Sequence, residues 1–270
     1  MIDIGNVKVE KSPFPHIVVH DFLPPKLYQE LSAEYPSDEI ITAGKPIESN
    51  TRYQISAAEI IRQKKLHPVW LDFVKYFVSP DWWQKVLNVF KESILREHPD
   101  IDLLLGRNLE ELTIGVRSRD LTDVVLDCQP GINSPVLHEN SVRGPHVDNP
   151  VELFGGLLYF RLPEDDSVGG DLILYKHKNK NPVFWGKAEL RENDVEVSRK
   201  VPYRANTLVL FVNSLNAVHG VSPRAKTQHS RRLVNIIGEV CQGGGLFNLP
   251  RDRSYLGKAR NRWYQYLYGW

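Results

Sequence analysis

The pattern of hydrophobic and polar positions changes character near residue 112. Before that point, apolar residues recur at three- and four-residue spacing, which is typical of amphipathic helices. After it, they fall in short runs separated by turn residues, which is typical of strands. A helical block followed by several short strands predicts a β barrel or sandwich braced by N-terminal helices.

The clearest helix start is Ser79-Pro80-Asp81, a capping residue followed by proline at the first helical position and an acidic residue. The helix that it opens carries a wide apolar stripe that includes Trp82 and Trp83, which we assign to the core, and should end near His98. The other elements expected before residue 112 are a strand at 17–19, helices starting at 21–25 and over 67–78, and a loop over 40–50.

Strands are expected wherever a short β-rich run lies between turn signals. Glycines at 131, 155–156, 169–170 and 220 are taken as the punctuation between them. The expected strands are 124–126, 157–162, 172–175, 195–197, 208–212 and 233–237. The basic and aromatic segment 255–270 is a candidate terminal helix.

Length and composition favour one soluble domain. The chain has 270 residues, 41% hydrophobic and 25% charged, and no Pro/Ser-rich linker interrupts it. We expect helical support over 1–110, a β core over 111–245 and a C-terminal tail over 246–270. All are predicted to belong to one domain.

Charge and cysteine content narrow the possible partners and the compartment. The formal net charge is +1, so bulk charge favours neither nucleic acid nor an anionic membrane. Two cysteines, Cys128 and Cys241, are too few for a secreted disulfide scaffold, and we predict a cytoplasmic protein. The N-terminus has no apolar core of a signal peptide, and no apolar run approaches a membrane span.

The chemistry-bearing pattern is His146-Val-Asp148, followed much later by His219. On an extended strand, residues i and i+2 point to the same face, so His146 and Asp148 can converge on one ion. A distant histidine completes a facial triad of the kind that non-heme Fe(II) oxygenases use, with positions left for co-substrate and oxygen. Hydrolytic zinc sites instead place histidines at i, i+4 on a helix. The alternatives are a surface His-x-Asp pair, a satisfied strand-end His219, and His138 as a competing ligand.

An arginine pair heads the strand expected at 233–237. A metal site with open positions needs a chelating anion, and an arginine fork suits the far carboxylate of that anion. Neighbours on a strand point to opposite faces, so only one of Arg231 and Arg232 can enter the interior.

These motifs together resemble the Fe(II)- and 2-oxoglutarate-dependent dioxygenases, in particular their prolyl-hydroxylase-like branch. The resemblance covers the β half and a short N-terminal segment. It is carried by Pro13-Phe-Pro-His-Ile-Val-Val-His-Asp-Phe-Leu-Pro24, Cys128-Gln-Pro-Gly131, His146-Val-Asp-Asn-Pro150, Gly169-Gly-Asp-Leu-Ile-Leu-Tyr175 and His219-Gly-Val-Ser-Pro223. It implies an α+β, mainly β fold with a double-stranded β-helix (jelly-roll or cupin-like) core.

The resemblance also implies roles for individual residues. His146, Asp148 and His219 would bind Fe(II), and no catalytic residue beyond them is implied. Arg231 would hold the distal carboxylate of 2-oxoglutarate, with Arg232 as the alternative. Arg231 is preferred because Asn235, on the same strand face, then falls where relatives place a small polar residue, and Asn235 could contact the same co-substrate.

Four further positions are candidates for ligand contact. Gln129 stands where many relatives have a tyrosine, and its amide could contact 2-oxoglutarate. Tyr159 is either a co-substrate contact or a core residue, and Arg143 is either a contact for an anionic substrate or a surface charge. His138 is either a substrate contact or a surface residue. The segment 176–200 either covers the site or is a polar insertion.

The expected activity is hydroxylation of an unactivated carbon in a small molecule or peptidyl side chain. The resemblance implies Fe(II), O2 and the co-substrate 2-oxoglutarate, which would yield succinate and CO2. A carboxylate at 148 favours hydroxylation or desaturation over halogenation. The alternatives are a metal-holding jelly roll that only binds a ligand, and a cupin-type enzyme that does not use 2-oxoglutarate.

Overall fold

The computed structural model describes residues 4–5, 7–186, 188–241 and 245–250. The candidate helix at 255–270 and most of the proposed tail therefore lie outside the described residues. In chain order the elements are β1 (His16–His20), α1 (Pro25–Ala33), α2 (Asp38–Thr42), β2 (Arg52–Gln54), α3 (Ala57–Gln63), α4 (Pro68–Phe77), α5 (Pro80–Glu97), α6 (Ile101–Leu105), η1 (Leu109–Glu111), β3 (Ile114–Val116), β4 (Val124–Asn133), β5 (Glu152–Tyr159), β6 (Leu172–His177), η2 (Glu192–Asp194), β7 (Val195–Val201), β8 (Thr207–Val212), β9 (His219–Val221) and β10 (Arg231–Val240).

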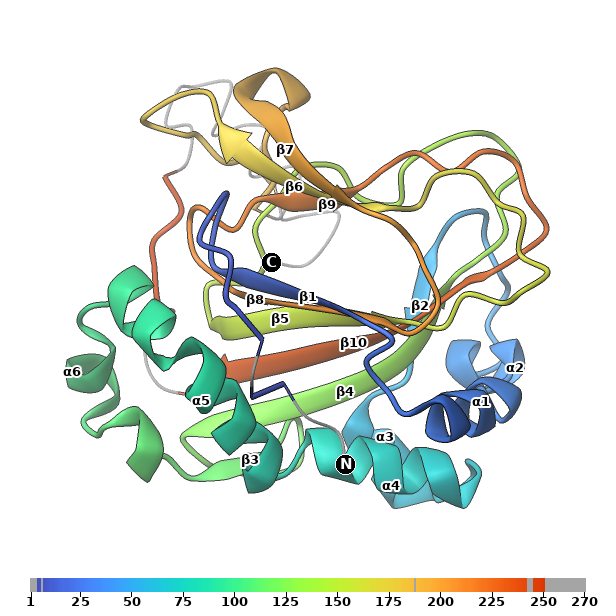
Figure 1. The fold of residues 1–270 in the computed structure, drawn as a ribbon, viewed down its shortest axis with the longest axis horizontal. Coiled ribbons are helices and arrows are strands. Elements are labelled where there is room, and N and C mark those ends of the chain that lie inside the picture. Colours follow the sequence, from blue (N-terminus) through green and yellow to red (C-terminus); the bar gives the residue numbers. More distant parts are fainter. Residues whose placement is uncertain (1–3, 6, 187, 242–244, 251–270) are drawn as a thin grey trace.

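The strands form two facing sheets. The larger has the order β1-β8-β5-β10-β4-β2, with β3 added parallel to β4, and the smaller has the order β7-β6-β9. In Figure 1 the smaller sheet lies on one side of the larger sheet and the helices on the other. This arrangement confirms the predicted fold class, a mainly β double-stranded β-helix braced by N-terminal helices.

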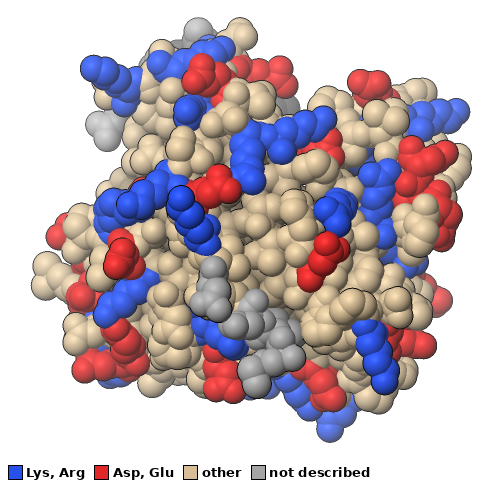
Figure 2. All heavy atoms as spheres, in the orientation of Figure 1, with Lys and Arg blue, Asp and Glu red and all other residues tan. Residues whose placement is uncertain are grey.

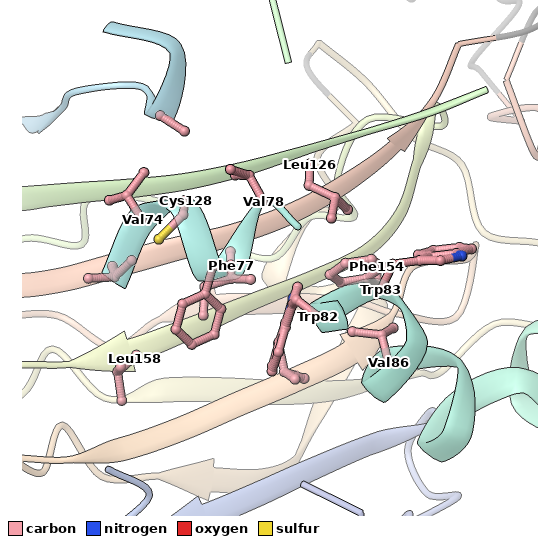
Figure 3. Packing of buried hydrophobic residues seen from close by; sticks show 14 of the residues in the cluster. Val74, Phe77, Val78, Trp82, Trp83, Val86, Leu126, Cys128, Phe154 and Leu158 are labelled. Carbon is pink, nitrogen blue, oxygen red and sulfur yellow. The ribbon is translucent and has the colours of Figure 1, made fainter. Parts of the chain in front are cut away.

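Each face of the larger sheet has its own core. Alternate residues on β4, β5, β8 and β10 point to the helices, and Cys128 and Leu158 are examples. Trp82 and Trp83 of α5 are buried against this face, as Figure 3 shows, so their assignment to the core is confirmed. The intervening positions, such as Leu157 and Leu233, pack between the two sheets with Leu172 of β6.

Helix α5 follows its predicted signals closely. Ser79 accepts a hydrogen bond from the Trp82 backbone amide, and the helix ends at Glu97, with His98 as its cap. The prediction of a loop over 40–50 is wrong at its start, where the chain is helical. Helix α2 ends at Thr42 and is capped by Ser37, whose hydroxyl accepts from the Ile40 amide.

Glycine was misread as punctuation within strands. Gly131 lies inside β4, and Gly155 and Gly156 lie inside β5, which therefore spans Glu152–Tyr159 instead of 157–162. A Cβ at Gly156 would lie 2.3 Å from Leu210 Cδ2, so glycine here permits the close approach of β5 and β8. Close backbone approach is a second reason for glycine in a strand.

The face of the molecule drawn in Figure 2 has no large patch of a single charge among the described residues. Lysine and arginine are interspersed with acidic residues on the face seen in Figure 2. Cys128 is buried and Cys241 exposed, and both are free. In the described part of the chain, no helix has both the length and the apolar character that crossing a bilayer requires.

Candidate metal and 2-oxoglutarate site

The two histidines and the aspartate expected as a triad come together between the sheets. Nε2 of His146 lies 3.6 Å from Asp148 Oδ1, and Nε2 of His219 lies 3.5 Å from Asp148 Oδ2. One donor atom from each of the three lies within 4.8 Å of the others. Two ligands that share one ion at bonds of about 2.1 Å adopt similar separations, so the set fits a metal.

Both imidazoles direct Nε2 toward the centre of the triad. Nδ1 of His146 lies 2.8 Å from the Gly144 carbonyl, and Nδ1 of His219 lies 2.9 Å from the Ala217 carbonyl. A carbonyl only accepts hydrogen bonds, so each Nδ1 carries the proton and each Nε2 offers its lone pair to the centre.

Burial keeps these histidines neutral. It is the largest cause that lowers the pKa of His146 to about 3 and also lowers that of His219. The two neighbouring histidines and Arg143 hold the pKa of Asp148 below its usual range against the opposing effect of burial. The donor set is thus two neutral imidazoles and one carboxylate.

Arg231 points into the space between the sheets and is completely buried. Its Nε donates to the Gly170 carbonyl (2.7 Å) and its Nη1 to Asn133 Oδ1 (3.1 Å), whereas Nη2 is buried with no partner among the described residues. No carboxylate of the described chain lies within ion-pair distance of this guanidinium. A buried cation without an anion is costly, so the site lacks a negative ligand.

Two residues around Arg231 also have polar groups without hydrogen-bond partners in the described part of the chain. The Tyr159 hydroxyl and the Asn133 amide nitrogen are buried without partners. The Arg231 guanidinium lies 4.8 Å from the centre of the Tyr159 ring and 5.0 Å from that of Tyr203. Two unpaired polar groups beside a buried cation whose own Nη2 is unpaired fit a bound carboxylate.

Arg232 lies on the opposite face of β10, as the alternation of strand residues requires. Its guanidinium lies 4.9 Å from the centre of the Tyr35 ring, on the helix side of the sheet.

A cavity of about 290 Å³ adjoins the triad. Its lining combines the three candidate ligands with apolar residues and charged side chains from several strands. The lining includes Arg52, Arg117, Arg143, Glu152, Leu157, Phe211, Asn235 and Ile237.

The structure brings together some of the weaker candidates and not others. Arg143 lines the cavity, with Nη1 3.5 Å from Asp148 Oδ1. Asn235 also lines it and donates to Gln129 Oε1 (3.3 Å), whereas the Gln129 amide nitrogen donates to Asp127 (2.6 Å). His138 is exposed and lies outside the cavity lining.

The insertion at 176–200 contacts the metal motif directly. The Val147 amide donates to the Ala188 carbonyl (3.1 Å), and the Leu190 amide donates to the Pro145 carbonyl (2.9 Å). Phe184 and Leu190 pack with Val147 in a small apolar cluster. The insertion therefore supports the extended segment that carries His146, which forms isolated β-bridges to Glu189 and His219.

Sequence reasoning missed Arg52 on β2. It lines the cavity, its Nε is buried without a partner, and no carboxylate pairs with it among the described residues. Burial, followed by the nearby Arg231 charge, lowers the pKa of Arg52 to about 10. The segment around it lacks a strong strand pattern, so only the register of β2 against Asn133 of β4 brings Arg52 to the site.

Comparisons with known proteins add a likeness of fold. No protein-family model matches the chain, and no curated protein matches it. The chain is similar to prolyl 4-hydroxylases. One from Phytophthora capsici is 17% identical with a TM-score of 0.47, and the match covers 84% of this chain but only 59% of that one.

A prolyl-4-hydroxylase from Pseudomonas putida is 15% identical with a TM-score of 0.43, over 85% of this chain and 93% of that one. The non-heme α-ketoglutarate-dependent epimerase SnoN from nogalamycin biosynthesis is 10% identical with a TM-score of 0.44, over 88% of each chain.

Proposed function

We propose that this protein is an Fe(II)- and 2-oxoglutarate-dependent dioxygenase that hydroxylates an unactivated carbon of its substrate. The observation that carries the proposal is the pairing of a two-histidine, one-carboxylate donor set with the completely buried, anion-free Arg231. A metal site that only bound a ligand would have no need for such a cation. A cupin-type reaction without 2-oxoglutarate would leave it unpaired.

His146, Asp148 and His219 would hold the metal, and two histidines with one carboxylate are the donor set of non-heme Fe(II) oxygenases, which keep positions open for other ligands. Such a centre, when bound, supplies oxidation of a substrate C–H bond to C–OH by O2, with 2-oxoglutarate leaving as succinate and CO2.

The polypeptide would bind and orient the co-substrate. Arg231 and the Tyr159 hydroxyl would take the distal carboxylate, and Asn133 Nδ2 lies in the same cluster of unpaired donors. Arg52 adds a second cation at this end, and we assign it to the co-substrate as well. Leu157 and Leu172 line the adjoining cavity and limit the access of water to the site.

The test is an anaerobic titration of the metal-free protein with Fe(II) and then 2-oxoglutarate, in which the visible charge-transfer band of the chelate is recorded. We expect the band in the wild-type protein and its loss at the same co-substrate concentration in Arg231→Gln. Iron binding without a band in the wild type would overturn the assignment of 2-oxoglutarate.

A further inference from the structure

The space between the sheets has ends of opposite charge. Arg231 begins β10, and Arg52 and Asn133 lie in register beside it. At the other end of β10, Glu239 lies opposite Glu152 of β5 in the strand register. At about 3.3 Å per strand residue, these ends are roughly 25 Å apart along β10, so one molecule of 2-oxoglutarate cannot serve both.

The acidic end holds more carboxylates than cations. Arg117 Nε donates to Glu239 Oε2 (2.8 Å), and Arg117 Nη1 lies 3.6 Å from Asp127. The second oxygen of Glu239, Oε1, is buried without a partner, and the residue is only 9% exposed. Glu152 lines the cavity and forms no ion pair with any described residue.

Taking the proposed reaction as given, we propose that this acidic end, with Glu152 as its main contact, binds a protonated aliphatic amine of the substrate. Buried carboxylates need a cation, and Arg117 is already shared between two of them. A second metal ion is disfavoured because Arg117 lies among the carboxylates, and because the described residues offer a metal-capable group only at the triad.

The apolar part of the cavity wall specifies the rest of the substrate. Phe211 of β8 and Ile237 of β10 lie opposite Gly155 of β5 and line the cavity, and both are almost completely buried. Such a surface fits methylene groups, so an aliphatic chain would present a carbon to the metal while its ammonium group reaches Glu152. The cavity of about 290 Å³ admits one slender chain.

The experiment measures succinate formation by the iron-loaded protein with three probes. L-lysine represents a free amine, Nα-acetyl-L-lysine amide represents a peptidyl amine, and Nα-acetyl-L-norleucine amide, which has no ammonium group, is the control. We expect one or both amines to stimulate succinate formation at concentrations about 10- to 100-fold lower than the norleucine derivative requires, as a charged hydrogen bond predicts. The ratio of the concentrations at which the two amines act shows whether the substrate amine belongs to a free amino acid or to a peptide.

Glu152→Gln should abolish this preference for an amine while leaving the half-saturating 2-oxoglutarate concentration and the chelate band unchanged. Glu196→Gln on the exposed face of β7 is the matched control and should behave as wild type. A normal band without stimulation by either amine, or an unchanged preference in Glu152→Gln, would overturn the amine subsite. Absence of the band in wild type would instead refute the dioxygenase proposal.

Discussion

His146 and His219 are joined by a reciprocal pair of backbone hydrogen bonds, although 72 residues separate them in the sequence. The His146 amide donates to the His219 carbonyl (2.9 Å), and the His219 amide donates to the His146 carbonyl (2.8 Å). This short antiparallel bridge holds the imidazole centres 4.3 Å apart. The backbone therefore fixes the spacing of the two candidate ligands before any metal binds.

Removing a ligand should destroy the metal site and leave the fold intact. His146→Ala and Asp148→Ala should each reduce Fe(II) affinity by more than the roughly 10- to 100-fold that loss of a second-sphere partner costs. Succinate formation should fall to background. Calorimetric titration and circular dichroism check both points, and full activity in either variant would exclude the triad.

Substitution of the two neighbouring arginines should have very different effects on the half-saturating 2-oxoglutarate concentration. Arg231→Gln removes the anion-free cation between the sheets and should raise the half-saturating 2-oxoglutarate concentration roughly 100-fold or more. Arg232→Gln removes a cation on the helix side and should change it little. Steady-state kinetics with each variant test the ranking, and the reverse order would show that the wrong strand face was chosen.

Tyr159→Phe separates co-substrate contact from core packing. An unpaired buried hydroxyl costs about 1–3 kcal/mol, so the metal-free variant should unfold at a higher temperature than wild type. The same change should raise the half-saturating 2-oxoglutarate concentration about tenfold or more, because a hydrogen bond to a carboxylate is lost. If only the unfolding temperature changes, Tyr159 is a core residue.

Gly155 tests the crowding around the metal site. A methyl group there would lie 3.2 Å from Asp148 Oδ2 and 3.1 Å from Phe211. Gly155→Ala should therefore weaken Fe(II) binding about 10- to 100-fold by displacing the carboxylate. Gly144→Ala, whose methyl would meet nothing within 4 Å, is the matched control in a metal titration and should bind as wild type.

Glu152→Gln should stabilise the metal-free protein in a pH-dependent manner. Burial, with Asp148 and Glu239 nearby, raises the pKa of Glu152 well above 4.5. A carboxyl with a raised folded-state pKa supports folding while protonated, and this contribution is lost as pH rises through that pKa.

The variant should therefore melt above wild type at about pH 8, and the difference should vanish near pH 4, where both side chains are neutral. Thermal unfolding at the two pH values measures it. An equal difference at both would show that the effect is not electrostatic.

The sequence by itself determined the elements with strong local signals. Ser79 and Pro80 specify the start of α5, and the apolar run at 208–212 specifies β8, because capping and strand patterning act over a few residues. The spacing of His146 and Asp148, together with the distant His219, predicted a metal site, because side chains at i and i+2 of an extended segment share one face. The adjacent arginines narrowed the anion site to two positions.

Only the tertiary structure decided which side chains meet. It buried Arg231 and turned Arg232 to the helices, because pairing of β10 with β4 and β5 sets the face of every residue on the strand. It brought Arg52 and Glu152 to the cavity through the register of β2 and β5, which no local pattern specifies. It also placed Gly155 and Gly156 within β5. These glycines allow the close approach of β8, which lies far along the chain, so no local pattern reveals their role.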